Sequence, residues 1–156
     1  MELTKAKNLV IELMSKHGLI AKGWTFKFDN AKRRFGYCAH YSKTIGLSKN
    51  LVFLNDEAQV KDTTLHEIAH ALCNVNHGHD EVWKAKAREV GCRDERCYGD
   101  NVTTPESKYI AECKGCGTTH KRHKRISGGR ISSCGKCSGG KYNTNFLLHY
   151  VPNPKY

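Results

Sequence analysis

Apolar spacing and capping residues predict three helices in the first two thirds of the chain. The first covers residues 4–17, the second runs for about 18 residues from an N-cap at Asn55, and the third covers residues 81–90. The apolar stripe of the first helix is Leu9, Val10, Leu13 and Met14, and that of the second is Val60, Thr64, Ile68 and Leu72. We expect the first stripe to pack over the second helix in a common core.

Three strands are predicted between the first two helices. They cover residues 24–28, 34–40 and 44–48, and residues 29–32 supply a turn after the first. Together they predict a small three-stranded antiparallel sheet on which the helices pack, so that the fold class is α+β. An exposed edge of this sheet would hold a peptide by strand addition.

Length and cysteine content favour a protein with two parts. A chain of 156 residues has room for one domain and a smaller metal-stabilised module. We expect these at residues 1–100 and 108–156, joined by a linker at 101–107. No apolar run resembles a signal peptide or a membrane span. We therefore expect a cytoplasmic or DNA-associated protein, in the nucleoid or nucleus, that is not secreted. In such a compartment the eight cysteines argue for metal binding more than for disulfides.

The net charge of +11 is concentrated toward the C-terminus. Residues 1–100 carry 16 lysines and arginines against 13 acidic residues, whereas residues 101–156 carry 10 against 2. A basic excess confined to a small module indicates a polyanionic partner, most simply nucleic acid. The alternative is a solvated basic surface without a partner.

The second predicted helix contains the motif His-Glu-x-x-His. His66 and His70 are four residues apart, so both imidazoles lie on one helix face and can bind the same metal ion. Glu67 lies within reach of water at that metal, as a zinc hydrolase requires. The alternative, an amphipathic helix with two histidines by chance, leaves Glu67 unexplained. His40 and Tyr41 are further candidates for the cleft, with Tyr41 as a donor to an oxyanion.

A catalytic zinc site needs a third protein ligand and keeps an open position. The candidates are His77 and His79, on either side of Gly78. Asp80 is predicted to cap the third helix, and a histidine immediately before that cap would point back toward the motif helix. We therefore expect His79 as the ligand, with His77 as the alternative.

Two C-x2-C pairs predict a second metal site. They are Cys113 with Cys116 and Cys134 with Cys137, separated by 17 residues. Each pair presents two thiolates at one turn, and two pairs complete a closed tetrahedral zinc site, as in a zinc ribbon. So small a module cannot bury much core, so the metal is expected to supply most of its stability. Cys38 and Cys73 are expected to be small buried hydrophobic residues. Cys92 and Cys97 are expected to be structural thiols, with a redox-sensitive pair as the alternative.

A basic run lies between the two cysteine pairs, at residues 120–125. The candidate nucleic-acid contacts are Lys121, Arg122, Lys124, Arg125 and Arg130. Tyr142, Phe146 and Tyr150 follow, and cations beside stacking rings are typical of a protein that binds single strands. The alternative for these rings is the apolar core of the module, which suits Phe146 at least as well.

The chain resembles the SprT-like, Spartan-related zinc metalloproteases from about residue 5 to about residue 150. The residues that carry the resemblance are His66, Glu67, His70, Gly78, His79 and Trp83, together with the four-cysteine module. The resemblance implies a zincin-like fold, with zinc on the three histidines and Glu67 as general base. It also implies protein substrates bound to or crosslinked with DNA, and hence a role in DNA repair. The loop between the second and third histidines has only eight residues, which indicates a minimal version of the domain.

Three functions follow from these patterns. The first is a zinc endopeptidase with one catalytic and one structural zinc ion, which cleaves proteins or peptides and is anchored to DNA, preferably single-stranded, by its basic ribbon. The second is a nucleic-acid-binding or transcription-associated protein that uses the protease-like fold as a scaffold, although a scaffold has no need of Glu67. The third is a zinc hydrolase that acts on something other than protein.

Overall fold

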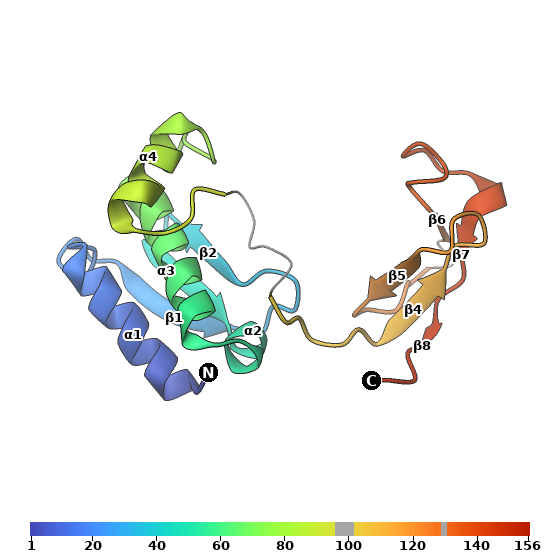
Figure 1. The fold of residues 1–156 in the computed structure, drawn as a ribbon, viewed down its shortest axis with the longest axis horizontal. Coiled ribbons are helices and arrows are strands. Elements are labelled where there is room, and N and C mark those ends of the chain that lie inside the picture. The colour runs from blue at the N-terminus through green and yellow to red at the C-terminus, as the bar shows by residue number, and fades with distance from the viewer. Residues whose placement is uncertain (96–101, 129–130) are drawn as a thin grey trace. The chain divides into compact units, whose positions relative to one another are not determined.

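The computed structural model describes residues 1–95, 102–128 and 131–156, and the chain divides after Pro105 into two units (Figure 1). The elements of the first unit are α1 (Leu3–Lys16), β1 (Thr25–Asp29), β2 (Gly36–Ala39), β3 (Thr44–Ser48), α2 (Lys49–Leu54), α3 (Glu57–Leu72) and α4 (Glu81–Val90). Those of the second unit are β4 (Tyr109–Glu112), β5 (Thr119–Arg122), β6 (Ser132–Ser133), η1 (Thr144–Phe146), β7 (Leu147–Leu148) and β8 (Val151–Pro152). The chain is therefore a mixed α+β protein, and none of its described helices has the length and apolar content that a membrane crossing needs.

The first sheet has the order β1-β3-β2 and is mixed rather than antiparallel. β3 pairs antiparallel with β2 but parallel with β1, with Phe26 opposite Ile45 and Phe28 opposite Leu47. The predicted all-antiparallel sheet is thus wrong for one of the two pairings. All five residues of β3 are buried, and this uncharged strand takes the centre of the sheet. The chain therefore reverses direction twice before β3 returns beside β1, and the two strands run the same way.

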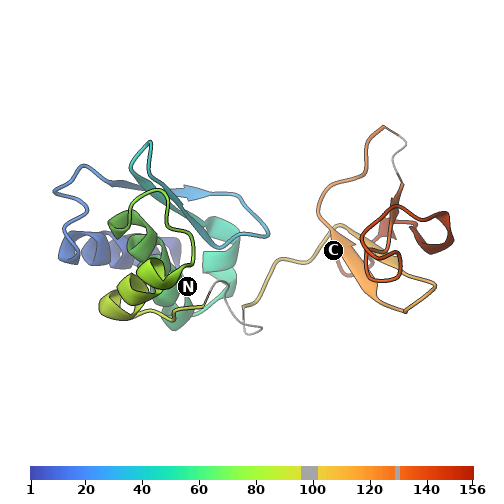
Figure 2. The same ribbon diagram turned by 90° about the horizontal axis from the view of Figure 1, so that it is seen from above.

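Helices α1 and α3 cover one face of this sheet, as the view in Figure 2 shows. Their predicted apolar stripes are confirmed as part of the core, in which Val10, Met14, Val60 and Ile68 have no exposed surface. Phe26 and Phe28 pack against the same core from β1. The motif helix α3 thereby packs on the sheet beside α1, and it contacts the edge strand β2.

Helix α3 begins one residue later than the sequence predicts. Asp56, rather than Asn55, is the N-cap, and its carboxylate accepts a hydrogen bond of 2.8 Å from the backbone N–H of Gln59. Asn55 is buried instead, where its amide donates to the carbonyls of Leu51 and Thr103. The amide of Asn55 has donors that a carboxylate lacks, so it suits the bridging position while Asp56 suits the cap.

Helix α2 was not predicted, whereas α4 has the predicted bounds. Ser48 caps α2 by accepting a hydrogen bond from the Leu51 N–H at 3.2 Å, but six residues are too few for helical periodicity to show. In α4, Asp80 caps the helix by accepting from the Trp83 N–H at 3.0 Å. Gly91 ends the helix in the left-handed conformation, at φ 85°.

The second unit is built from two very small sheets, one of order β5-β4-β8 and one that pairs β6 with β7. Its buried apolar residues are Ala111, Cys113, Cys134 and Leu148. Two of these are cysteines of the predicted metal site, so the core is little more than the cysteine cluster and its cover.

Residues of the predicted linker contact the units on either side of Pro105. Thr103 donates its backbone N–H to the Asn55 side chain at 2.8 Å in the first unit. The Ser107 carbonyl accepts a hydrogen bond of 2.8 Å from Asn153 in the second. The described residues of the predicted linker are therefore divided between the two units, with the boundary after Pro105.

Candidate metal centres

Three histidines converge at one point of the first unit. His66 and His70 come from one face of α3, and His79 comes from the loop that precedes α4. The Nε2 atom of His79 lies 3.1 Å from that of His66 and 3.2 Å from that of His70. Nitrogens bound at about 2.0–2.1 Å to a tetrahedral zinc ion lie about 3.4 Å apart. The spacing and the chemistry of this donor set are therefore consistent with zinc.

His77, the alternative third ligand, lies outside this group. Its Nδ1 is 2.8 Å from the carboxylate of Asp80, so it supports the residue that caps α4. The group of converging ligand atoms contains His79 instead. His79, the histidine immediately before the N-cap Asp80, therefore points back toward α3, as the sequence predicts.

Two of the three imidazoles are kept neutral by their surroundings. Burial lowers the pKa of His66 to about 4, and the neighbouring His79 acts in the same direction. Burial likewise lowers the pKa of His70 to about 4, with smaller effects from His66, His79 and His40. Neutral imidazole is the form that binds a metal ion, so these ligands are ready to bind at neutral pH.

Glu67 is buried between α3 and the edge strand β2, and only 7% of it is exposed. A Cβ atom at Gly36 of β2 would lie 2.8 Å from its Oε1 atom, so glycine is what lets the strand approach so closely. Burial raises the pKa of Glu67 to about 8, and the guanidinium of Arg34 acts in the opposite direction. A carboxyl group in such a place can take up and release a proton near neutral pH.

A cavity of about 440 Å³ opens beside the histidines and Glu67. Three arginines line it, Arg33, Arg34 and Arg93, together with the backbone of β2 at Gly36. Arg93 is paired with Asp62 at 2.7 Å. Sequence reasoning did not identify these arginines, because their distance from the motif in sequence hides their position at the cleft.

Tyr41 and His40 are not among the residues that line the cavity. The Tyr41 side chain is fully exposed, so the interpretation of Tyr41 as an oxyanion donor is wrong. His40 instead packs edge to face against Trp24, with ring centroids 5.6 Å apart. The effect of His40 on the site is a small lowering of the pKa of His70.

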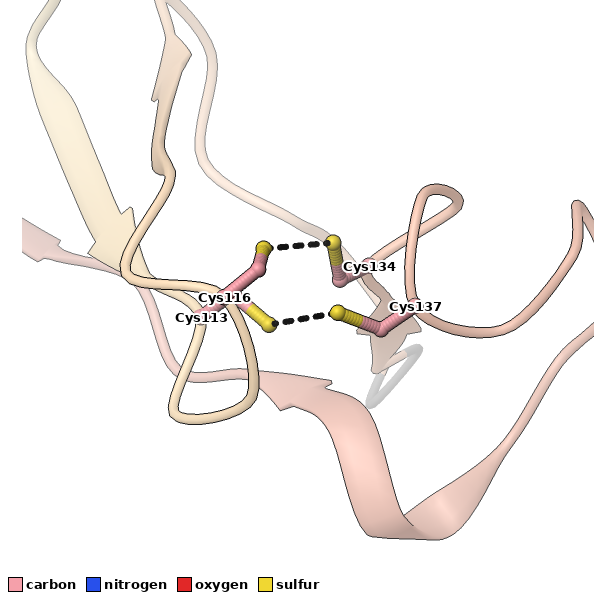
Figure 3. Close-up of side chains that lie close together, drawn as sticks. All are labelled: Cys113, Cys116, Cys134 and Cys137. Carbon is pink, nitrogen blue, oxygen red and sulfur yellow. Dashed lines mark hydrogen bonds between the residues drawn. The ribbon is translucent and has the colours of Figure 1, made fainter.

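The four cysteines of the C-terminal unit form a second group of converging ligand atoms (Figure 3). The Sγ atoms of Cys113 and Cys137 lie 3.8 Å apart, as do those of Cys116 and Cys134. Thiolates bound at about 2.3 Å to a tetrahedral zinc ion lie about 3.8 Å apart. A disulfide would need about 2.05 Å. The group is therefore consistent with a closed zinc site and not with two disulfides.

Hydrogen bonds prepare one of these thiols for metal binding. The hydroxyl and backbone N–H of Thr118 lower the pKa of Cys116, which favours its thiolate, whereas the hydrogen bond with Cys116 raises the pKa of Cys137. Gly115 lies at the same turn, where a Cβ atom would be 2.8 Å from the ring of Phe146. Phe146 thus covers the cysteine cluster, which favours the core interpretation of this ring.

The other cysteines belong to neither group of converging ligand atoms in the described part of the chain. Burial raises the pKa of both Cys38 and Cys92 to about 12, so these thiols stay protonated at neutral pH. Cys73 is buried in the core of the first unit. Cys97 lies outside the residues that the structure describes.

The basic run of the second unit is divided between two faces of its sheet. Arg122 lies opposite Tyr109 in the β5–β4 register, and its guanidinium is 5.2 Å from the ring centroid of Tyr150. Lys121 is the preceding residue of β5 and therefore faces the other side. Lys124 and Arg125 line a cavity of about 460 Å³ together with both tyrosines.

The other predicted contacts of this unit differ in how accessible they are. Tyr142 is 64% exposed, whereas Tyr150 packs against the cysteine cluster. Arg130 lies outside the residues that the structure describes.

Comparison with known proteins identifies the first unit. Residues 9–105 match the family model of the SprT-like family. Among curated proteins, none matches the chain. The matched residues contain the second half of α1, the helices α2 to α4, the mixed sheet and the three converging histidines. Because the match spans more than half of the chain, the chain belongs to the SprT-like family, and its first unit is a metallopeptidase-like domain.

Proposed function

We propose that this chain is a zinc-dependent endopeptidase that acts on proteins bound or crosslinked to DNA. The observation that carries the proposal is a buried carboxylate, Glu67, beside three converging imidazoles at the wall of a cavity. A purely structural metal site does not need such a carboxylate. Membership of the SprT-like family supports the same chemistry.

His66, His70 and His79 would hold the catalytic zinc ion. When bound, zinc supplies a Lewis acid that polarises the scissile carbonyl and acidifies water. Glu67 accepts a proton from the attacking water, so that an O–C bond forms at the carbonyl carbon. It then delivers this proton to the leaving nitrogen as the C–N bond breaks. The open edge of β2 borders the cavity, where it would bind the substrate backbone as an added strand.

The second unit would be a zinc ribbon that anchors the enzyme to DNA. Its residues carry 10 of the 26 lysines and arginines of the chain and only 2 of its 15 acidic residues. Cys113, Cys116, Cys134 and Cys137 would hold a structural zinc ion, because four thiolates leave no open position for a reaction. Cations on both faces of the β5 strand would contact the phosphates of a single strand.

A peptidase assay tests this proposal directly. Casein, or an unstructured peptide, is incubated with the full chain in the presence and absence of single-stranded DNA. Cleavage by the wild type is expected, and Glu67→Gln should lower its rate by about 10²–10⁴-fold while zinc is retained, because an amide cannot accept the proton. A wild type that binds zinc at the histidines but cleaves no faster than Glu67→Gln would leave the nucleic-acid-binding scaffold as the better interpretation.

A further inference from the structure

One buried tryptophan touches all three of the converging imidazoles. Trp83 lies in the first turn of α4 and has no exposed surface. Its ring centroid is 4.6 Å from that of His66, 5.1 Å from that of His70 and 4.5 Å from that of His79. The indole is stacked on His70 and tilted or edge-on to the other two, so it forms a common wall behind the three rings.

The usual way to fix a metal-binding imidazole is different. The ring nitrogen that does not bind metal generally donates to a carboxylate or a carbonyl, which sets the orientation of the ring. Within the described part of the chain, the hydrogen bonds of His66 and His70 run through Nε2, toward His79, and not from Nδ1 to a carboxylate or carbonyl. Ring packing on Trp83 is therefore what holds these two imidazoles in their converging orientation.

The indole N–H shows that packing is the role of this side chain. Trp83 Nε1 is buried and has no hydrogen-bond partner among the described residues. Burying a donor without an acceptor is unfavourable. A site that needed only an apolar filler would be better served by a ring without a donor. Tryptophan has the largest aromatic ring system, and here its surface is broad enough to contact all three histidines.

We propose that Trp83 is a positioning residue that preorganises His66, His70 and His79, and thereby sets the affinity of this site for a divalent metal ion. The inference rests on one part of the proposed function, metal binding by the three histidines, and not on peptidase activity. A metal ion then meets three converging nitrogens, with His79 Nε2 already 3.1 and 3.2 Å from those of His66 and His70, instead of ordering three side chains itself. Trp83 also becomes an optical reporter of the site.

Trp24 is a matched control, since the chain contains two tryptophans. It is nearly as buried, at 8% exposed, and it packs against His40 rather than against the three converging histidines. Losing Trp24 should lower stability without acting on the metal ligands. Trp83→Leu and Trp24→Leu therefore separate a positioning role from a structural one, and Trp83→Phe tests whether a smaller aromatic ring rescues the site.

The experiment is a cobalt(II) titration of the full chain, in which thiolate absorption reports the four-cysteine site separately. Trp83→Leu should weaken cobalt binding at the histidines by about 10–100-fold, the range found when support of metal ligands is removed. Trp83→Phe should recover most of this loss, and Trp24→Leu should bind as the wild type does. The four-cysteine site should be unchanged in all three variants. Affinity of folded Trp83→Leu within twofold of wild type would overturn the proposal.

Fluorescence keeps the test decisive if Trp83→Leu does not fold. In Trp24→Phe the only remaining indole is Trp83, and cobalt at the histidines should quench its emission strongly. In Trp83→Phe, which retains Trp24, quenching should be weaker. Emission from Trp83 that does not respond to cobalt at the histidines would overturn the proposal. Failure of the peptidase assay leaves these binding measurements unaffected, so the two outcomes are distinguishable.

Discussion

At the scale of single residues, the Glu67 carboxyl group is subject to two opposing influences. Burial against β2 raises its pKa to about 8, whereas the guanidinium of Arg34 lowers it. Arg34 is itself held in place by Asp29 and by the ring of Tyr37, 4.4 Å from its guanidinium carbon. The position of one cation therefore contributes to the pH range in which Glu67 is ionised.

Removing that cation should shift the pH dependence of cleavage. Arg34→Met should raise the pKa of Glu67, because the ionised form loses a favourable neighbour. A general base acts when ionised, so activity is lost as the pH falls through its pKa, and the acidic limb of kcat/KM should move to higher pH. Arg33→Met is the matched control, since Arg33 lines the same cavity but is not among the main influences on the Glu67 pKa. Profiles of the two variants that coincide would contradict the prediction.

At the scale of elements, the close approach of an edge strand to the motif helix defines the site. β2 passes α3 so closely that a Cβ atom at Gly36 would lie 2.8 Å from Glu67 Oε1 and 3.0 Å from Thr63 Cγ2. The backbone of this strand thus forms one wall of the cavity and the cover of the carboxylate at the same time. A side chain at position 36 would prevent the strand from lining the cavity and covering the carboxylate in this way.

Gly36→Ala should therefore damage catalysis without removing the metal. The added methyl group must displace the Glu67 carboxylate, and a displacement of about 1 Å can cost about 10²-fold in rate. We expect kcat to fall by about this factor while zinc content stays at the wild-type level. Gly78→Ala is the control, because its Cβ atom would meet nothing within 4 Å. Normal activity in Gly36→Ala would show that the strand can move away at little cost.

At the scale of the whole molecule, the two units differ in how they are stabilised. The first has an extended core in which α1, α3, α4 and the sheet all take part. Among its described residues the second has four buried apolar ones, and two of these are ligands of its candidate metal site. Folding of the second unit should therefore depend on metal, and folding of the first should not.

Metal removal should unfold one unit selectively. A strong chelator is expected to abolish hydrogen-exchange protection in residues 106–156 while α1 and α3 stay protected. Cys134→Ser should reproduce this effect without a chelator, whereas His70→Ala should not. Metal analysis of the loaded protein should give two zinc ions per chain and one in either variant. Retained protection of β4 and β5 after chelation would mean that the unit folds without its metal.

The charge of the second unit leads to a prediction about DNA affinity. Replacing Lys121, Arg122, Lys124 and Arg125 with alanine in the full chain should weaken binding to single-stranded DNA and flatten its salt dependence. Each lost phosphate contact removes about 0.7 from the slope of log affinity against log salt concentration. The control removes four exposed cations of the first unit, Lys5, Lys7, Lys16 and Lys22. Equal losses in the two variants would mean that only the total charge matters.

The features that the sequence predicts correctly are those that depend on neighbours along the chain. An i, i+4 pair on a helix fixes the relation of His66 to His70 whatever surrounds them. Asp80 and Gly91 mark the ends of α4 by capping geometry that is local. Two thiolates at each C-x2-C turn likewise converge for local reasons, and the four sulfurs lie as the spacing predicts.

Only the tertiary structure decided the features that join distant segments. β1 pairs in parallel with β3 because the fully buried strand β3 takes the centre of the sheet. The alternation of apolar and polar residues along one strand does not reveal which strand takes the centre. Gly36 meets Glu67, and Trp83 meets three imidazoles, because separate elements pack on one core. The sequence by itself therefore determined which histidines converge as a candidate metal site and which carboxyl group lies beside them. The contact of Gly36 with Glu67, the packing of Trp83 on the histidines and the position of Arg34 near Glu67 depend on close packing between residues far apart in the chain. Sequence spacing does not predict that packing.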